Sequence, residues 1–169
     1  MSLFPPDIVE RAAAILDLCR ARRLTLATAE SCTGGLIAAC LTEIAGASDV
    51  FERGFVTYSN RAKEELLGVA PQTLARFGAV SRETALEMAI GAQARAKTDI
   101  AISVTGIAGP GGGGSNEKPV GLIHLAIALS VSLPLHRECR FGEIGRSEIR
   151  MLTLRQALHL TEEALRQTA

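Results

Sequence analysis

A serine in a glycine-bearing turn is the first residue of this chain whose surroundings suit chemistry. Ser31 follows the apolar segment 24–29 and precedes Gly34, Gly35 and a run of small residues typical of a helix. Such a turn exposes a hydroxyl at the end of a strand and leaves backbone N–H groups free to bind negative charge. Ser31 is therefore a candidate nucleophile, part of a phosphate site, or simply a helix N-cap. Cys32 is the rival nucleophile, because a thiolate at a helix N-terminus is stabilised there.

A nucleophilic serine needs a base, and Lys63 is the candidate. All three histidines follow residue 120 and nothing in the sequence pairs one with Cys32, so lysine is the usual substitute. If Asn60 caps the next helix, Lys63 lies in its first turn, where the helix dipole favours the neutral amine. The alternative is a solvated lysine beside Glu64. Tyr58, the only tyrosine, either relays or orients a proton or is a core or rim residue.

A second glycine-rich stretch, residues 106–115, follows the apolar segment 99–105. Glycines let a backbone approach a phosphate closely, so this loop is a candidate nucleotide site; a surface loop is the alternative. It is neither a Walker loop nor a dinucleotide fingerprint, because a strand follows it. Arg146 and Arg150 fall on one face of the last helix, where they either grip a phosphate or lie on the surface. Without HExxH or CxxC motifs, the sequence predicts no metal site and no cofactor.

Alternating strands and helices must position these residues. The patterns predict strands at 24–29, 51–58, 99–105, 120–130 and 137–141. They predict a first helix that residues 5–7 open and whose apolar positions extend to residue 19, and further helices at 33–45, 60–68, 71–77, 81–97 and 146–166. This order predicts an α/β fold, a single-domain α/β/α layered sandwich over residues 1–169. Because the last two strands follow one another without a helix, we expect a mixed, mostly parallel central sheet.

Composition excludes several classes of protein. The 169 residues carry 18 basic and 18 acidic side chains and no tryptophan, which argues against direct nucleic-acid binding. No apolar run approaches the ~20 residues of a membrane span, and the N-terminus lacks the features of a signal peptide. The four cysteines have no disulfide or metal-site spacing, so we expect free thiols in a reducing cytoplasm. The residues concerned are Cys19, Cys32, Cys40 and Cys139.

Several ordered blocks together resemble the C-terminal domain of the bacterial competence/damage-inducible protein CinA, a family of nicotinamide mononucleotide deamidases. The blocks are residues 28–35 (TAESCTGG), 54–60 (GFVTYSN), Lys63, 78–81 (GAVS), 103–110 (SVTGIAGP) and 117–121 (EKPVG). The resemblance covers residues 7–165 and implies the stand-alone form, without the nucleotide-processing domain of longer relatives. The sequence departs from the family at Ile144-Gly145-Arg146, where relatives often carry Gly-Asp-Arg or Gly-Asn-Arg, and in a longer glycine loop.

The resemblance implies an amidohydrolase that converts nicotinamide mononucleotide to nicotinic acid mononucleotide and ammonia, a step in recycling NAD. The implied catalytic residues are Ser31 as nucleophile, Tyr58 and Lys63, with backbone N–H groups after Ser31 holding the oxyanion. The implied substrate-binding residues are Glu30, Thr33, Gly34, Gly35, Thr105, Gly106, Gly109 and Arg146. We expect a cytoplasmic homodimer that binds a small pyridine nucleotide and neither nucleic acid nor membrane. The alternatives are a non-catalytic pyridine-nucleotide-binding module and an interaction domain connected with competence or DNA damage.

Overall fold

A five-stranded mixed sheet forms the centre of the molecule. The computed structural model describes residues 2–111 and 116–168. The strands are β1 (Leu26–Glu30), β2 (Phe51–Val56), β3 (Ile100–Gly106), β4 (Leu122–Leu129) and β5 (Ser132–Arg140), in the spatial order β2-β1-β3-β4-β5. β1 pairs in parallel with β2 and β3, whereas β4 is antiparallel to both β3 and β5. The mixed α/β sheet predicted from the sequence is therefore confirmed, with β4 the one strand that runs against the others.

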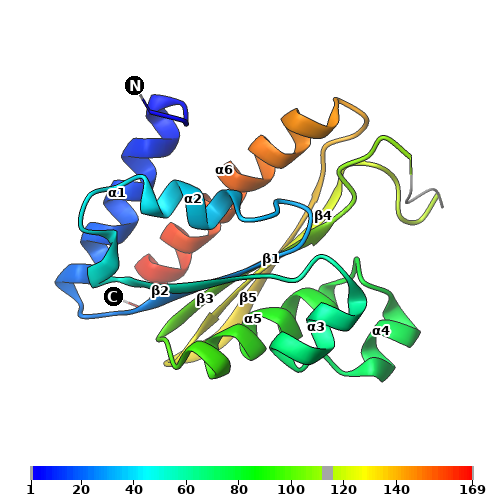
Figure 1. Ribbon diagram of the computed structural model, residues 1–169, viewed down its shortest axis with the longest axis horizontal. Helices are drawn as coiled ribbons and strands as arrows, with labels where there is room; N and C mark the ends of the chain where they lie inside the picture. The colour runs from blue at the N-terminus through cyan, green and yellow to red at the C-terminus, as the bar shows by residue number, and fades with distance from the viewer. Residues whose placement is uncertain (1, 112–115, 169) are drawn as a thin grey trace.

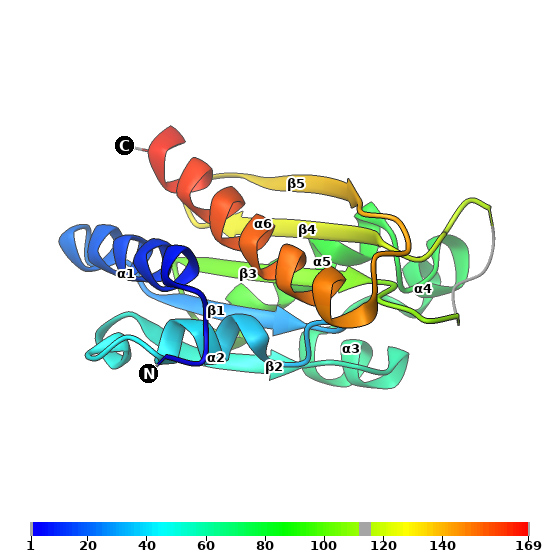
Figure 2. The same ribbon diagram turned by 90° about the horizontal axis from the view of Figure 1, so that it is seen from above.

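Helices cover both faces of this sheet (Figures 1 and 2). One layer contains α1 (Pro6–Ala21), α2 (Leu36–Thr42) and α6 (Arg146–Gln167), and the other contains α3 (Asn60–Leu67), α4 (Pro71–Phe77) and α5 (Arg82–Ala96). A short 3-10 helix at Ala47–Asp49 leads into β2. Each layer has its own apolar cluster, one including Leu16 and Leu158, the other built mainly of alanines, Met88 and Leu67. The small side chains of the second cluster let α5 pack closely against the sheet.

The connections place three chain segments at one edge of the sheet. The parallel strands β2, β1 and β3 all end there, so the segments that follow them lie side by side. Backbone bonds lock these ends together: Ser31 N donates to Val104 O at 3.0 Å and Thr57 N donates to Glu30 O at 2.8 Å. The carboxyl ends of parallel strands are where α/β proteins bind ligands.

Three local expectations need correction. α2 begins at Leu36 rather than at residue 33, because Gly34 (φ +60°) and Gly35 (φ +100°) turn the chain through left-handed conformations first. α3 is capped by Ser59, whose hydroxyl accepts from Ala62 N at 3.0 Å, and not by Asn60. β5 begins five residues before the predicted strand 137–141, because a proline such as Pro134 is tolerated in an edge strand.

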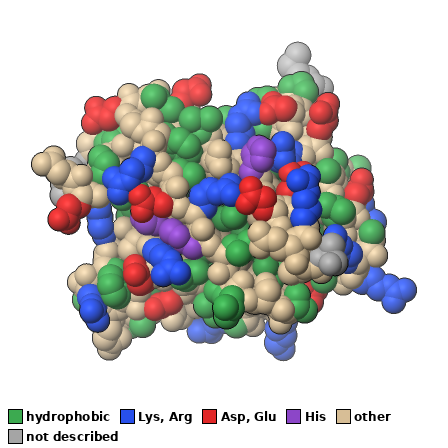
Figure 3. All heavy atoms as spheres, turned by 180° about the vertical axis from the view of Figure 1, so that it is seen from behind, with side chains coloured by type: hydrophobic (Ala, Val, Ile, Leu, Met, Phe, Trp, Pro, Cys, Tyr) green, Lys and Arg blue, Asp and Glu red, His purple; other side chains and the backbone are tan. Residues whose placement is uncertain are grey.

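The exterior carries charges of both signs. Figure 3 shows Lys and Arg side chains interspersed with Asp and Glu on one face, and no large region of a single sign is visible there. Within the described residues, no helix is both long and apolar enough to cross a membrane. All four cysteines are free thiols, and three of them are buried.

Candidate active site

The carboxyl end of β1 and the first turn of α3 bring a serine and a lysine together. Lys63 Nζ lies 3.0 Å from Ser31 Oγ and donates to the carbonyl of Thr57 at 2.8 Å. Ser31 is 8% exposed and Lys63 only 1%. The solvated-lysine alternative is therefore wrong, and the predicted serine–lysine pair exists as a buried contact.

Burial sets the protonation of this lysine. It lowers the pKa of Lys63 from 10.5 to about 8, and the nearby Cys32 thiol acts weakly in the opposite direction. The principal cause is thus the loss of water around the ammonium, and the contribution of the helix dipole stays a prediction. An amine with this pKa is neutral in roughly a tenth of molecules at neutral pH, far more often than a solvated lysine.

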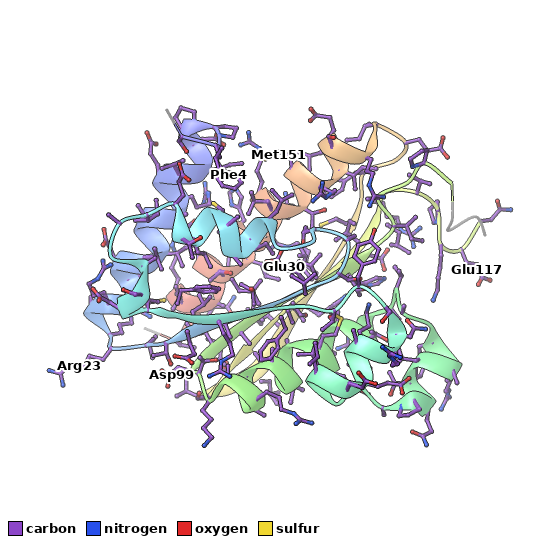
Figure 4. The ribbon with its side chains drawn as sticks, in the orientation of Figure 1. Phe4, Arg23, Glu30, Asp99, Glu117 and Met151 are labelled. Atoms are coloured by element: carbon purple, nitrogen blue, oxygen red, sulfur yellow. The ribbon has the colours of Figure 1, made fainter. Side chains whose placement is uncertain are left out.

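Glu30 holds the start of α2. Its carboxylate accepts from Gly35 N at 3.1 Å, Ile37 N at 3.0 Å and Ala38 N at 2.9 Å. Figure 4 shows Glu30 between β1 and α2. These contacts satisfy N–H groups that a helix start leaves unpaired. Glu30 therefore has a structural role that the sequence did not reveal, and the N-cap role considered for Ser31 belongs to this carboxylate.

The turn between β1 and α2 leaves two backbone donors available. Ser31 N, Gly34 N and Gly35 N are engaged with Val104 O, Ser31 O and the Glu30 carboxylate. Among the described residues, the N–H groups of Cys32 and Thr33 donate to no other residue, and the Cys32 N–H faces only its own thiol. Free donors beside a nucleophile are the requirement for holding an oxyanion.

A cavity of about 360 Å³ opens onto the Ser31–Lys63 pair. Its lining includes Tyr58, Arg146, Thr105 and the chain from Gly106 to Gly111, which brings together all three catalytic candidates and four of the predicted substrate-binding residues. Three others, Thr33, Gly34 and Gly35, are not in the lining, and neither is Glu30. The predicted contact of the glycine loop with a nucleotide rests partly on residues 112–115, which lie outside the described residues.

For two of the lining residues, Thr105 and Gly106, the structure explains why that residue type is present. Thr105 is buried and its hydroxyl donates to the carbonyl of Ala79 at 2.7 Å, which joins β3 to the segment before α5. Gly106 is required by packing, because a Cβ there would lie 2.3 Å from Ile123 Cδ1 and 2.8 Å from Leu122 O. Glycine at this position therefore lets β4 approach the pocket wall closely.

The mouth of the cavity is formed by an exposed pair. Arg146 donates from Nη2 to Tyr58 Oη at 2.8 Å and from Nη1 to Gly109 O at 2.7 Å. Tyr58 is 61% exposed, and among the described residues no hydrogen bond links its hydroxyl to Ser31 or Lys63. The structure thus places Tyr58 at the rim, the second of the two positions considered from the sequence.

Comparison with known proteins identifies the family. Residues 9–165 match the CinA C-terminal domain. The crystal structure of competence/damage inducible protein CihA from Agrobacterium tumefaciens is 58% identical, with a TM-score of 0.94 over 98% of this chain and 99% of that chain. This chain belongs to the CinA C-terminal domain family. The resemblance noted from the sequence is confirmed.

Relatives within the CinA family differ in length. Nicotinamide-nucleotide amidohydrolase PncC from Escherichia coli (strain K12) is 54% identical over 125 residues, which cover 73% of this chain and 75% of that protein. The CinA-like protein of Chloroherpeton thalassium is 58% identical over 117 residues, 69% of this chain but 28% of that protein. The chain spans 32% and 34% of two competence-damage relatives from Acetivibrio thermocellus and Moorella thermoacetica.

Cys32 does not have the properties of a nucleophile in this CinA domain. Burial raises the pKa of its thiol to about 12, which disfavours the reactive thiolate. Two of the three histidines interact with each other: His124 Nδ1 lies 2.9 Å from His136 Nε2, and the two rings stack. Burial lowers the pKa of both histidines. Ser31 is therefore the better-placed nucleophile of the two neighbours.

The site also contains residues whose side-chain types did not predict a role there. Ala79 and Val80 line the cavity, and their only signal was the family-like block 78–81. Thr57 supplies a carbonyl to Lys63, a role for which its side-chain type gives no signal. In the described part of the chain, no group of three His, Cys, Asp or Glu side chains is arranged to hold a metal ion.

Proposed function

We propose that this CinA domain hydrolyses the carboxamide of nicotinamide mononucleotide, giving nicotinic acid mononucleotide and ammonia. The observation that carries the proposal is the 3.0 Å contact between Lys63 Nζ and Ser31 Oγ at the floor of an open cavity. A buried amine of lowered pKa beside a hydroxyl is the arrangement of a nucleophile with its general base. The name of the E. coli relative, nicotinamide-nucleotide amidohydrolase, supports the same substrate class.

Acylation of Ser31 is the first half of the proposed reaction. The neutral amine of Lys63 takes the hydroxyl proton while Ser31 Oγ bonds to the carboxamide carbon, and the C=O π electrons move to oxygen. The free N–H groups of Cys32 and Thr33 stabilise this oxyanion. The C=O bond then re-forms as the C–N bond breaks, and the Lys63 ammonium returns its proton to the departing nitrogen, which leaves as ammonia.

Hydrolysis of the ester completes the cycle. A water molecule gives a proton to the regenerated Lys63 amine and attacks the acyl carbon. When the second tetrahedral intermediate collapses, Ser31 Oγ recovers its proton and the carboxylic acid is released. The hydrogen bond from Lys63 Nζ to Thr57 O holds the side chain in place throughout the reaction.

The rim of the cavity is suited to the charged end of the nucleotide. Arg146 carries a guanidinium at the mouth, within reach of Tyr58 and Gly109, and a phosphate can replace these neutral acceptors with a stronger charge-assisted pair. Thr105, Gly106 and Gly109 border the space between rim and floor. We therefore assign substrate contact to Arg146, Thr105, Gly106 and Gly109, contact with the oxyanion to the backbone N–H of Thr33, and a shaping role to Glu30, Gly34 and Gly35.

Ammonia release is the direct test. Purified protein is incubated with nicotinamide mononucleotide, nicotinamide riboside or free nicotinamide, and ammonia and the acid product are both quantified. We expect one acid per ammonia from the mononucleotide, slower turnover of the riboside, and unchanged rates with chelator. A chain that binds the mononucleotide but releases no ammonia would replace this proposal with the non-catalytic binding module. Cytoplasmic location and a homodimer stay predictions, the latter open to light scattering.

A further inference from the structure

Arg150 grips the turn that follows the nucleophile. It projects from α6, where Nε donates to Cys32 O at 3.2 Å and Nη2 donates to Thr33 O at 2.9 Å. The side chain is partly buried and is not part of the cavity lining, unlike Arg146 one helical turn earlier. Two arginines on one helix face therefore bind different segments, and Arg150 engages only protein carbonyls among its hydrogen bonds to described residues.

These two hydrogen bonds fix the orientation of two peptide units. In a trans peptide the N–H points opposite to the C=O of the same plane. Holding Cys32 O toward α6 directs Thr33 N–H away from α6, and holding Thr33 O there directs Gly34 N–H toward Ser31 O, to which it donates at 3.0 Å. The bond from Gly34 N fixes the Ser31 carbonyl, and Cys32 N–H, which belongs to the same peptide plane, therefore points in the opposite direction to that carbonyl. Both free donors of the turn thus depend on Arg150.

The turn needs such support because its own sequence is permissive. Gly34 and Gly35 adopt positive φ angles, and glycine moves between backbone conformations at little cost. The Glu30 carboxylate fixes the turn from the side of α2, but its hydrogen bonds to described residues do not include the N–H of Cys32 or Thr33. A forked guanidinium holds two acceptors in fixed geometry, which a single ammonium does not.

We propose that Arg150 is a positioning residue for the amide hydrolysis assigned above: it holds the 32–34 peptides so that Cys32 N–H and Thr33 N–H stabilise the oxyanion formed on attack by Ser31. Its positive charge, one peptide away, adds to this stabilisation, since interactions with developing charge strengthen in a partly buried site. The inference rests on the proposed function only for the identity of the amide. Any acyl donor that reacts with Ser31 passes through the same oxyanion.

The test compares Arg150→Met and Arg150→Lys with Arg155→Met. Arg155 lies on the same helix and pairs with Asp7 of α1, so its loss controls for removing an α6 arginine. With nicotinamide mononucleotide we expect Arg150→Met to lower kcat about 10- to 100-fold while KM changes less than about threefold. Arg150→Lys recovers part of the loss, and Arg155→Met keeps wild-type constants. Thermal unfolding identifies any variant that has lost its fold. If Arg150→Met is unfolded, the kcat and KM of Arg150→Lys test the positioning role instead.

Other outcomes would overturn the inference. A raised KM at constant kcat would make Arg150 a phosphate contact, and unchanged constants would make it a purely structural residue. p-Nitrophenyl acetate separates this proposal from the substrate assignment, because it acylates a serine without any nucleotide. If the wild type acetylates at Ser31 but releases no ammonia from the mononucleotide, the substrate is wrong, and the acetylation rate of Arg150→Met then decides the positioning role. Failure of both reactions would overturn both proposals.

Discussion

The floor and the rim of the cavity hold two polar pairs of opposite character. At the floor, Ser31 and Lys63 are almost completely buried and face each other at 3.0 Å. At the rim, Tyr58 and Arg146 are exposed and bonded at 2.8 Å. Water surrounds the rim, whereas burial at the floor lowers the pKa of its lysine to about 8. We therefore expect the chemistry at the floor and substrate recognition at the rim.

This contrast has a cost and a benefit. A buried amine without a carboxylate partner opposes folding, because its charged form has lost water. The same loss makes the amine a base near neutral pH. An exposed arginine has no such penalty, and its long side chain remains free to exchange Tyr58 and Gly109 for a ligand. Variants at the two levels should therefore separate kcat from KM.

The largest effect is expected from Ser31→Ala. Removing the attacking oxygen should lower kcat by on the order of 10⁴-fold or more, as nucleophile removal does in other serine hydrolases. Binding of nicotinamide mononucleotide, followed by calorimetry, should change little because the rim is intact. Ammonia release by Ser31→Ala at more than a few per cent of the wild-type rate would place the nucleophile elsewhere.

Lys63→Met should lower kcat about 10²- to 10⁴-fold, the usual range for losing a general base. Lys63→Arg should not restore it, because a guanidinium stays protonated. For the wild type, kcat/KM should rise with pH up to a plateau above pH 8, as the amine becomes neutral. A profile of ammonia release from pH 6 to 10 tests the sign: a rate that falls across this range would contradict the base role.

Stability provides the control for Lys63. Its folded pKa of about 8 lies below the ordinary 10.5, so the unfolded chain binds more protons between these values. The wild-type free energy of unfolding should therefore increase as pH rises from 8 to 10.5, and Lys63→Met should lack this increase. Arg61→Met, on the exposed side of the same helix, should retain it. Urea unfolding at several pH values measures both.

The sequence predicted the floor better than its supports. Ser31 follows the end of a strand and Lys63 lies in the first turn of a helix, and local sequence patterns predict such positions well. The resemblance implied substrate contact for Glu30. A carboxylate beside Ser31 looks the same in the sequence whether it faces a ligand or caps α2, and only the fold shows its three backbone bonds. Arg146 and Arg150 share a helix face, yet their partners depend on loops far away in the chain.

Arg146→Gln tests whether the rim of the cavity binds the phosphate. Losing a guanidinium contact to phosphate is expected to raise KM about 10- to 100-fold with kcat nearly constant. Tyr58→Phe should raise KM by less than about tenfold, because it removes one neutral hydroxyl. Steady-state kinetics with the mononucleotide and the riboside separate the effects, since Arg146→Gln should hardly affect the riboside. A fall in kcat for Tyr58→Phe at constant KM would instead support the proton-relay role first predicted for this tyrosine.

The smallest effect should come from Cys32→Ala, which lies between floor and turn. Its thiol has a pKa of about 12, so it supplies no thiolate, while its N–H and carbonyl belong to the backbone and survive the substitution. We expect kcat and KM within about threefold of wild type and a stability loss of about 1 kcal/mol from the reduced packing. Iodoacetamide should leave the wild type active for the same reason. Loss of activity in Cys32→Ala with Ser31→Ala still active would reverse the two roles. Burial of this sulfur makes the opposite result the one we expect.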